Sequence, residues 1–134
     1  MARILLVQNY SGELAGIASI ASYVNQNHQV DIALGSYHHI IKKYSSFRQD
    51  VVGISVLTKD HNWALRLAAQ VKSIDKKSII LLGGPHPTFY PEIINDKHVD
   101  AICIGDGEKL VLNLLDRIKN NEEAVDGERF RLYW

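Results

Sequence analysis

The chain of 134 residues alternates five times between a short apolar run and a segment with helical periodicity. The apolar runs are continuous and rich in Val, Ile and Leu, which is typical of strands covered by helices on both faces. Because strand–helix–strand repeats join parallel strands through right-handed crossovers, this alternation constrains the fold more than any other feature. The expected strands span residues 3–7, 30–34, 51–56, 78–82 and 101–104.

Apolar residues at helical spacing predict helices over residues 14–24, 37–44, 64–74 and 110–118. A further short helix is expected to begin at Pro91, because Pro suits the first position of a helix. Together these elements predict an α/β fold of Rossmann-like or flavodoxin-like type, with a doubly wound, five-stranded parallel sheet in the order 2-1-3-4-5.

The domain is predicted to span residues 1–119, and residues 120–134 a polar linker or terminal segment that leads to a missing domain. The large apolar residues that end the chain suggest contact with such a domain. In an alternative interpretation they form a further strand at the edge of the sheet.

The composition of the chain argues against several classes of function and site. Lys plus Arg equals Asp plus Glu at 15 each, which argues against a nucleic-acid-binding surface. The one cysteine, Cys103, excludes an internal disulfide and a cysteine-held cluster, and is expected to be a small core residue. No apolar stretch approaches the roughly 18 residues of a membrane span, and the chain begins with a strand pattern rather than a signal peptide. A cytoplasmic location is therefore expected.

Several familiar sites are missing from the sequence. There is no glycine-rich dinucleotide fingerprint after the first strand and no P-loop. The acids of a response-regulator receiver are replaced by Gln8, Asn9 and Ser55. The six histidines are not spaced as a metal cluster, and only His61 and His86 fall in loops at the carboxyl ends of strands. Neither a metal site nor a catalytic residue is predicted.

The segment Gly83-Gly84-Pro85-His86-Pro87-Thr88 ends the fourth strand with two glycines and two prolines. Glycine lets a ligand approach the backbone closely, and proline stops the strand. Ligands bind at the carboxyl ends of strands in open α/β sheets. Small, hydroxyl-bearing or acidic residues follow other strands there too: Tyr10, Ser11, Ser55, Thr58, Gly105, Asp106, Gly107 and Glu108. The alternative to binding is structural: Thr58 or Asp60 caps the third helix, and Asp106 and Glu108 cap the last one.

Four segments together resemble the N-terminal cobalamin-binding domain of cobalamin-dependent radical SAM enzymes. They are residues 50–58, 64–74, 82–88 and 99–108, with the Gly-Gly-Pro-His-Pro-Thr and Gly-Asp-Gly-Glu motifs as the specific pair. The resemblance covers about residues 4–118. It implies a module that holds cobalamin with its dimethylbenzimidazole tail extended between strands, for a methyltransferase or cyclase.

The resemblance also implies residue roles. Ser55, Leu57 and Thr58 would contact the tail or corrin, Gly83 and Gly84 would line the tail channel, and His86 and Thr88 would lie near the corrin edge or the domain junction. The loops that contain Tyr10 and Ser11, and Gly105, Asp106, Gly107 and Glu108, complete the expected cofactor site.

Two departures from related proteins matter. The loop after the first strand lacks the histidine with which methionine-synthase-type domains bind cobalt, so a base-off cobalamin without a His ligand is expected. The Cys-x-x-x-Cys-x-x-Cys motif of radical SAM enzymes is absent, so S-adenosylmethionine and the [4Fe-4S] cluster would belong to a partner catalytic domain, in the same or a separate chain. Two alternatives stay open: a cofactor-free docking or substrate-positioning domain, and a flavodoxin-like nucleotide or FMN binder.

Overall fold

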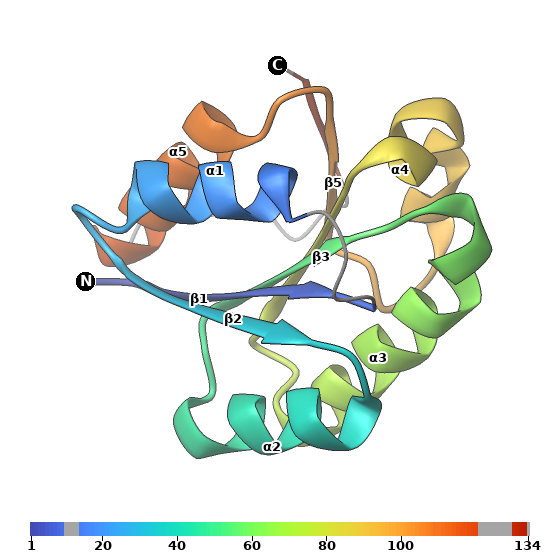
Figure 1. The fold of residues 1–134 in the computed structure, drawn as a ribbon, viewed down its shortest axis with the longest axis horizontal. Helices are drawn as coiled ribbons and strands as arrows, with labels where there is room; N and C mark the ends of the chain where they lie inside the picture. The colour runs from blue at the N-terminus through green and yellow to red at the C-terminus, as the bar shows by residue number, and fades with distance from the viewer. Residues whose placement is uncertain (10–13, 121–129, 134) are drawn as a thin grey trace.

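The computed structural model describes residues 1–9, 14–120 and the backbone of residues 130–133. Its strands form one parallel sheet in the order β2-β1-β3-β4-β5-β6 (Figure 1). They are β1 (Arg3–Gln8), β2 (Gln29–Leu34), β3 (Val51–Ser55), β4 (Ile79–Gly83), β5 (Ala101–Ile104) and β6 (Phe130–Tyr133). The predicted order 2-1-3-4-5 is therefore confirmed, and one further strand extends it.

The further strand, β6, pairs in parallel with β5, as in the alternative interpretation of the last residues. The rest of the linker predicted over residues 120–134 falls on residues 121–129 and 134, which lie outside the described residues, and it stays a prediction.

Helices cover both faces of the sheet. The α-helices are α1 (Ala15–Val24), α2 (Tyr37–Phe47), α3 (His61–Ile74), α4 (Pro85–Phe89) and α5 (Glu108–Lys119), with 3₁₀ turns η1 (Thr58–Asp60) and η2 (Pro91–Asn95). Figure 1 shows α1 and α5 on one face and α2 and α3 on the other. The chain is thus doubly wound, as predicted.

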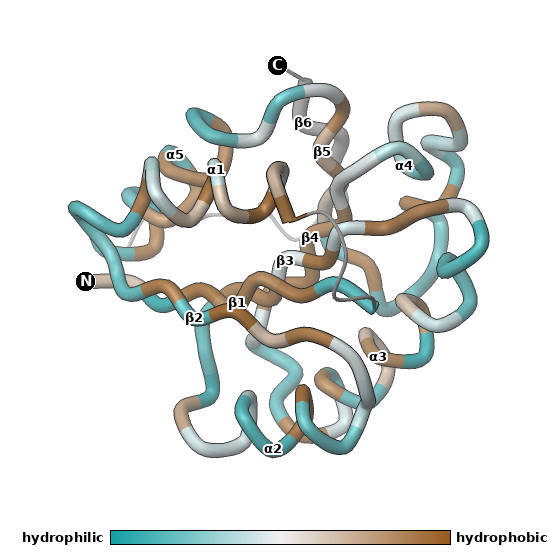
Figure 2. The backbone as a smooth tube through the Cα atoms, viewed as in Figure 1, coloured by the Kyte–Doolittle hydropathy of each residue, from teal (hydrophilic) through white to brown (hydrophobic). Residues whose placement is uncertain are grey.

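Each continuous apolar strand contributes to two cores, because successive side chains point to opposite faces of a sheet. On β1, Leu5 and Val7 pack with α2 and α3, whereas Ile4 and Leu6 pack with α1 and α5. Figure 2 shows hydrophobic residues concentrated along the strands between the two helical layers.

The short helix α4 was not predicted. The prolines at positions 85 and 87 predict only the end of the strand, yet Pro85 begins a helix of five residues, at a position where its missing amide is not needed. Gly84 makes this possible with a φ of 95°. A Cβ on Gly84 would lie 3.1 Å from the backbone nitrogen of Val56, so a glycine is required where β4 ends against β3.

At the amino end of the sheet, His28 connects α5 to the turn after α1. Its Nε2 lies 2.7 Å from Asp116 Oδ1, and its Nδ1 accepts a hydrogen bond from the Ala2 amide at 3.2 Å. Because Nδ1 is an acceptor, the ring proton is on Nε2 and is donated to Asp116.

Candidate functional site

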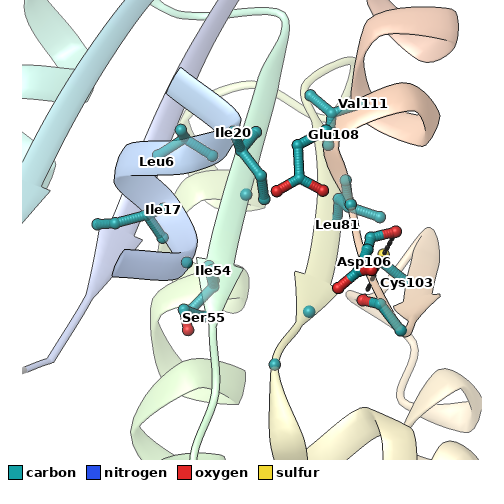
Figure 3. Close-up of a pocket in the computed structure, with 16 residues that line it drawn as sticks. Leu6, Ile17, Ile20, Ile54, Ser55, Leu81, Cys103, Asp106, Glu108 and Val111 are labelled. Carbon is teal, nitrogen blue, oxygen red and sulfur yellow. Dashed lines mark hydrogen bonds between the residues drawn. The ribbon is translucent and has the colours of Figure 1, made fainter. Parts of the chain in front are cut away.

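A narrow cavity of about 160 Å³ lies between the sheet and the layer of α1 and α5 (Figure 3). It reaches from the carboxyl ends of β3, β4 and β5 to the middle of the sheet. Its sheet side consists of Leu6, Gly53, Ile54, Ser55, Leu81, Gly83, Gly84 and Cys103. Its helical side consists of Gly16, Ile17 and Ile20 from α1, and Gly105, Asp106, Gly107, Glu108 and Val111 around the start of α5.

Glycines keep the cavity open. A Cβ on Gly53 would lie 3.1 Å from Leu6 Cδ2, and one on Gly107 would lie 3.0 Å from Ile20 Cδ1. Side chains at these positions would therefore occupy the space. Sequence reasoning missed Gly53 as a site residue, although a glycine inside a strand often marks a close approach of another group.

The polar groups of the cavity are few. Ser55 supplies an uncharged hydroxyl, and Asp106 and Glu108 supply carboxylates. A side-chain capping bond from the two acids is not seen, because the N-cap of α5 is Gly107, but Glu108 lies in the first turn of α5, where its charge complements the helix dipole. Glu108 Oε1 instead accepts a hydrogen bond from Ser19 Oγ on α1, at 2.8 Å.

Cys103 lines the cavity and is 5% exposed, which confirms the expected core position. Burial, and then the negative charges of Glu108 and Asp106, raise the pKa of its thiol to about 11. The thiol is thus protonated near neutral pH and forms part of an uncharged surface.

Four of the predicted site residues lie outside this cavity: Leu57, Thr58, His86 and Thr88. The buried His86 ring stacks between His61 and Tyr90, with centroids 4.9 and 5.1 Å away. We name these three rings the His86 stack. Burial, and then the nearby His61, lower the pKa of His86.

Hydrogen bonds hold this second group together. His86 Nδ1 lies 3.2 Å from Thr58 Oγ1, and Thr88 Oγ1 donates to the Gly84 carbonyl at 3.0 Å. The structure therefore divides the predicted site into a cavity group and a packed group.

The loop after β1 contains the remaining predicted residues, Tyr10 and Ser11, which lie outside the described residues. Just before it, Asn9 Nδ2 donates to Asp60 Oδ1 at 2.8 Å. Asp60 stands at the N-cap position of α3 but makes no capping bond with its side chain, so the alternative role considered for it is not seen.

Among the described residues, no group of three or more His, Cys, Asp or Glu residues is placed to hold a metal ion. Over the same residues, no helix combines the length and apolar character that crossing a membrane requires.

Comparison with known proteins relates the chain to longer enzymes. It is 32% identical over 120 residues to an uncharacterized methyltransferase from Pyrococcus horikoshii, covering 84% of this chain and 26% of that protein. It is 29% identical over 125 residues to the anaerobic magnesium-protoporphyrin IX monomethyl ester cyclase of Rubrivivax gelatinosus, covering 87% of this chain and 21% of the cyclase. The chain thus spans about a quarter of the length of these relatives.

The fold matches the solved structure of the cobalamin-dependent S-adenosylmethionine radical enzyme OxsB, with a TM-score of 0.75 and 20% identity, over 92% of this chain and 19% of that one. The model of the B12 binding domain matches residues 4–115. Because this match takes in nearly all of the sheet and its helices, the chain belongs to the B12-binding domain family, as its motifs led us to expect.

Proposed function

We propose that this domain binds cobalamin base-off, without a histidine ligand to cobalt, and with the nucleotide tail inserted in the cavity between the sheet and the layer of α1 and α5. The observation that supports this most directly is the cavity itself, which opens at the edge of the sheet where ligands of such folds bind.

The size of the cavity fits a tail rather than a whole cofactor. Pockets for complete small molecules measure roughly 300–1,000 Å³. The cavity measures about 160 Å³, so only a slender part of a ligand would enter it. The corrin would then lie outside, and contacts of Leu57, Thr58, His86 and Thr88 with it stay predictions.

The lining suits an apolar ring joined to polar groups. Ile17 and Leu81 offer apolar contact, and Ser55 offers a hydroxyl. Gly53 and Gly107 leave the space that side chains would fill. These residues would hold the tail. Gly84 also allows the end of β4 to lie close to the backbone that follows β3.

Two observations support a cobalt without a histidine ligand. Residues 10–13, which follow β1 in the sequence, include no histidine. His86, at the carboxyl end of β4, has rings on both of its faces and Thr58 at Nδ1. A ring packed in this way is poorly placed to serve as a ligand.

Bound cobalamin supplies a cobalt centre that carries a methyl group. The names of the relatives include a methyltransferase and a cyclase. We propose that this domain serves an enzyme of that kind, in which a radical SAM domain supplies S-adenosylmethionine and the iron–sulfur cluster.

The test is titration of the purified chain with hydroxocobalamin, followed by desalting and absorption spectroscopy. We expect a retained chromophore with a base-off spectrum, and no retention of FMN. Retained FMN would favour the flavodoxin-like alternative. A chain that retains neither would favour the docking alternative.

Gly83→Trp tests the location of the tail. A Cβ on Gly83 meets only Cys103 Cβ, at 3.7 Å, so a larger side chain can extend into the cavity. We expect loss of cobalamin retention with a native circular dichroism spectrum. His38→Trp, on the exposed surface of α2, is the matched control and should bind normally. Gly84→Trp is unsuitable, because a Cβ at this position would lie 3.1 Å from the Val56 backbone nitrogen, and a loss of binding could then come from damage to the fold.

A further inference from the structure

The charge of the cavity differs from what its apolar lining suggests. Asp106 and Glu108 are the charged residues among those that line it, and both are acidic. No lysine, arginine or histidine is among the lining residues. The cavity therefore has a negative potential that an anionic group would have to overcome.

Glu108 is placed to act on a ligand directly. Figure 3 shows its carboxylate pointing into the space between Ile20 of α1 and Leu81 of β4. One of its oxygens accepts the hydrogen bond from Ser19. A carboxylate offers about four acceptor positions, so further acceptor capacity remains on the cavity side.

The thiol of Cys103 lies close enough to both carboxylates to be affected by their charge. Cys103 belongs to β5, on the sheet side, and both Glu108 and Asp106 raise the pKa of its thiol. The positive end of the α5 dipole offsets only part of this negative potential.

Resting on the proposed function, we infer that Glu108 determines which part of the nucleotide tail enters the cavity. The Glu108 carboxylate accepts a hydrogen bond from a hydroxyl or amine of the tail and disfavours the entry of its phosphate. In cobalamin the donor is a ribose hydroxyl, while the phosphate stays at the mouth of the cavity. Glu108 is thus a specificity-determining residue for corrinoids that carry a nucleoside.

The inference predicts a difference between two ligands. Cobinamide contains the corrin but lacks the nucleotide, so Glu108 would have nothing to bind. Removal of the carboxylate should therefore weaken the binding of cobalamin and leave the binding of cobinamide unchanged. A change confined to one of the two ligands cannot come from general damage to the fold.

The experiment measures the dissociation constants of both corrinoids by absorption titration, for the natural chain, Glu108→Ala and Ser19→Ala. A hydrogen bond to a charged group supports an expected loss of about tenfold in cobalamin affinity for Glu108→Ala, with less than about a twofold change for cobinamide. Glu108→Gln keeps the shape of the side chain and serves if the alanine variant does not fold.

Ser19→Ala is the matched control. It removes the hydrogen bond between α1 and α5 but keeps the carboxylate, and Ser19 does not line the cavity. If Glu108 acts on the tail, this variant keeps the preference for cobalamin over cobinamide. If Glu108 acts only by joining the two helices, Ser19→Ala loses the preference too, which would overturn the inference.

The remaining outcomes are also decisive. An unchanged preference in Glu108→Ala contradicts the inference while leaving the proposed function intact. If the natural chain binds neither corrinoid, the proposed function and the inference fall together. If it binds both equally, the tail does not use the cavity.

Discussion

The two faces of the sheet are packed differently, and β3 shows this at neighbouring positions. Val52 is fully buried on the face of α2 and α3, and the next residue, Gly53, borders the cavity on the other face. Large side chains such as Tyr44 and Leu67 fill the first face. Glycines leave space in the second. Both faces are buried cores, but the space for the proposed ligand lies on the face of α1 and α5.

The largest effect on stability is expected in the filled face. Leu67 is fully buried there, so Leu67→Ala should lower the free energy of unfolding by about 2–5 kcal/mol, the usual cost of a cavity in a core. Urea denaturation measures this change. Cobalamin affinity of the folded variant should stay within about twofold of the natural value. A parallel loss of affinity would show that the two faces are not independent.

A smaller effect is expected where the two faces meet at the carboxyl edge. Gly84 has a φ of 95° and backbone contacts, so Gly84→Ala should cost about 1–3 kcal/mol of stability. Gly83→Ala, its matched control, meets only an ordinary contact at 3.7 Å and should change stability by less than about 1 kcal/mol. Equal losses in the two variants would refute this distinction.

The His86 stack, outside the cavity, should make stability depend on pH. The pKa of His86 is lowered below 6.5 by burial and by His61, against an opposing effect of Glu92. The unfolded chain therefore binds a proton more readily than the folded one. The contribution of His86 is complete above pH 6.5 and is lost as the pH falls through that value toward the folded pKa.

His86→Phe keeps an aromatic ring in the stack but removes the titration. Urea unfolding measured between about pH 5 and about pH 8 should show a weaker decline at acidic pH in this variant. His38→Phe, at an exposed position, is the control and should follow the natural chain. Identical pH profiles for all three chains would show that His86 does not cause the loss of stability at acidic pH.

The smallest effect is expected inside the cavity, at Cys103. The negative charge of Glu108 helps to raise the pKa of this thiol, so Glu108→Gln should lower that pKa and speed alkylation by iodoacetamide. A rate increase of a few fold at about pH 8, with unchanged unfolding, is the expected result. An unchanged rate would show that the charge does not reach the thiol.

The sequence predicted the sheet well because continuous apolar runs must form strands buried on both faces. The sequence did not predict α4, because a proline can mark the end of a strand or the first residue of a helix. Of the expected cofactor site, Ser55, Gly83 and Glu108 border the cavity, whereas Leu57 and His86 do not. Residue type and spacing do not distinguish the residues that line the cavity from those that do not. The difference depends on which face of the sheet each residue occupies once the chain has folded.

The bond between Ser19 and Glu108 could not be predicted at all. The two residues are 89 positions apart and meet only because α1 and α5 cover the same face. The packing of one helix beside another is a property of the folded chain, and no local pattern encodes it.

The bond between His28 and Asp116 has a consequence for how the cavity admits a ligand. It joins α5 to the turn after α1 at the amino end of the sheet, whereas the mouth lies at the carboxyl end. Toward the mouth, α1 and α5 are joined by the hydrogen bond between Ser19 and Glu108. If the proposed cavity widens to admit a ligand, we therefore expect the hydrogen bond at Ser19 to break while the one at His28 is kept.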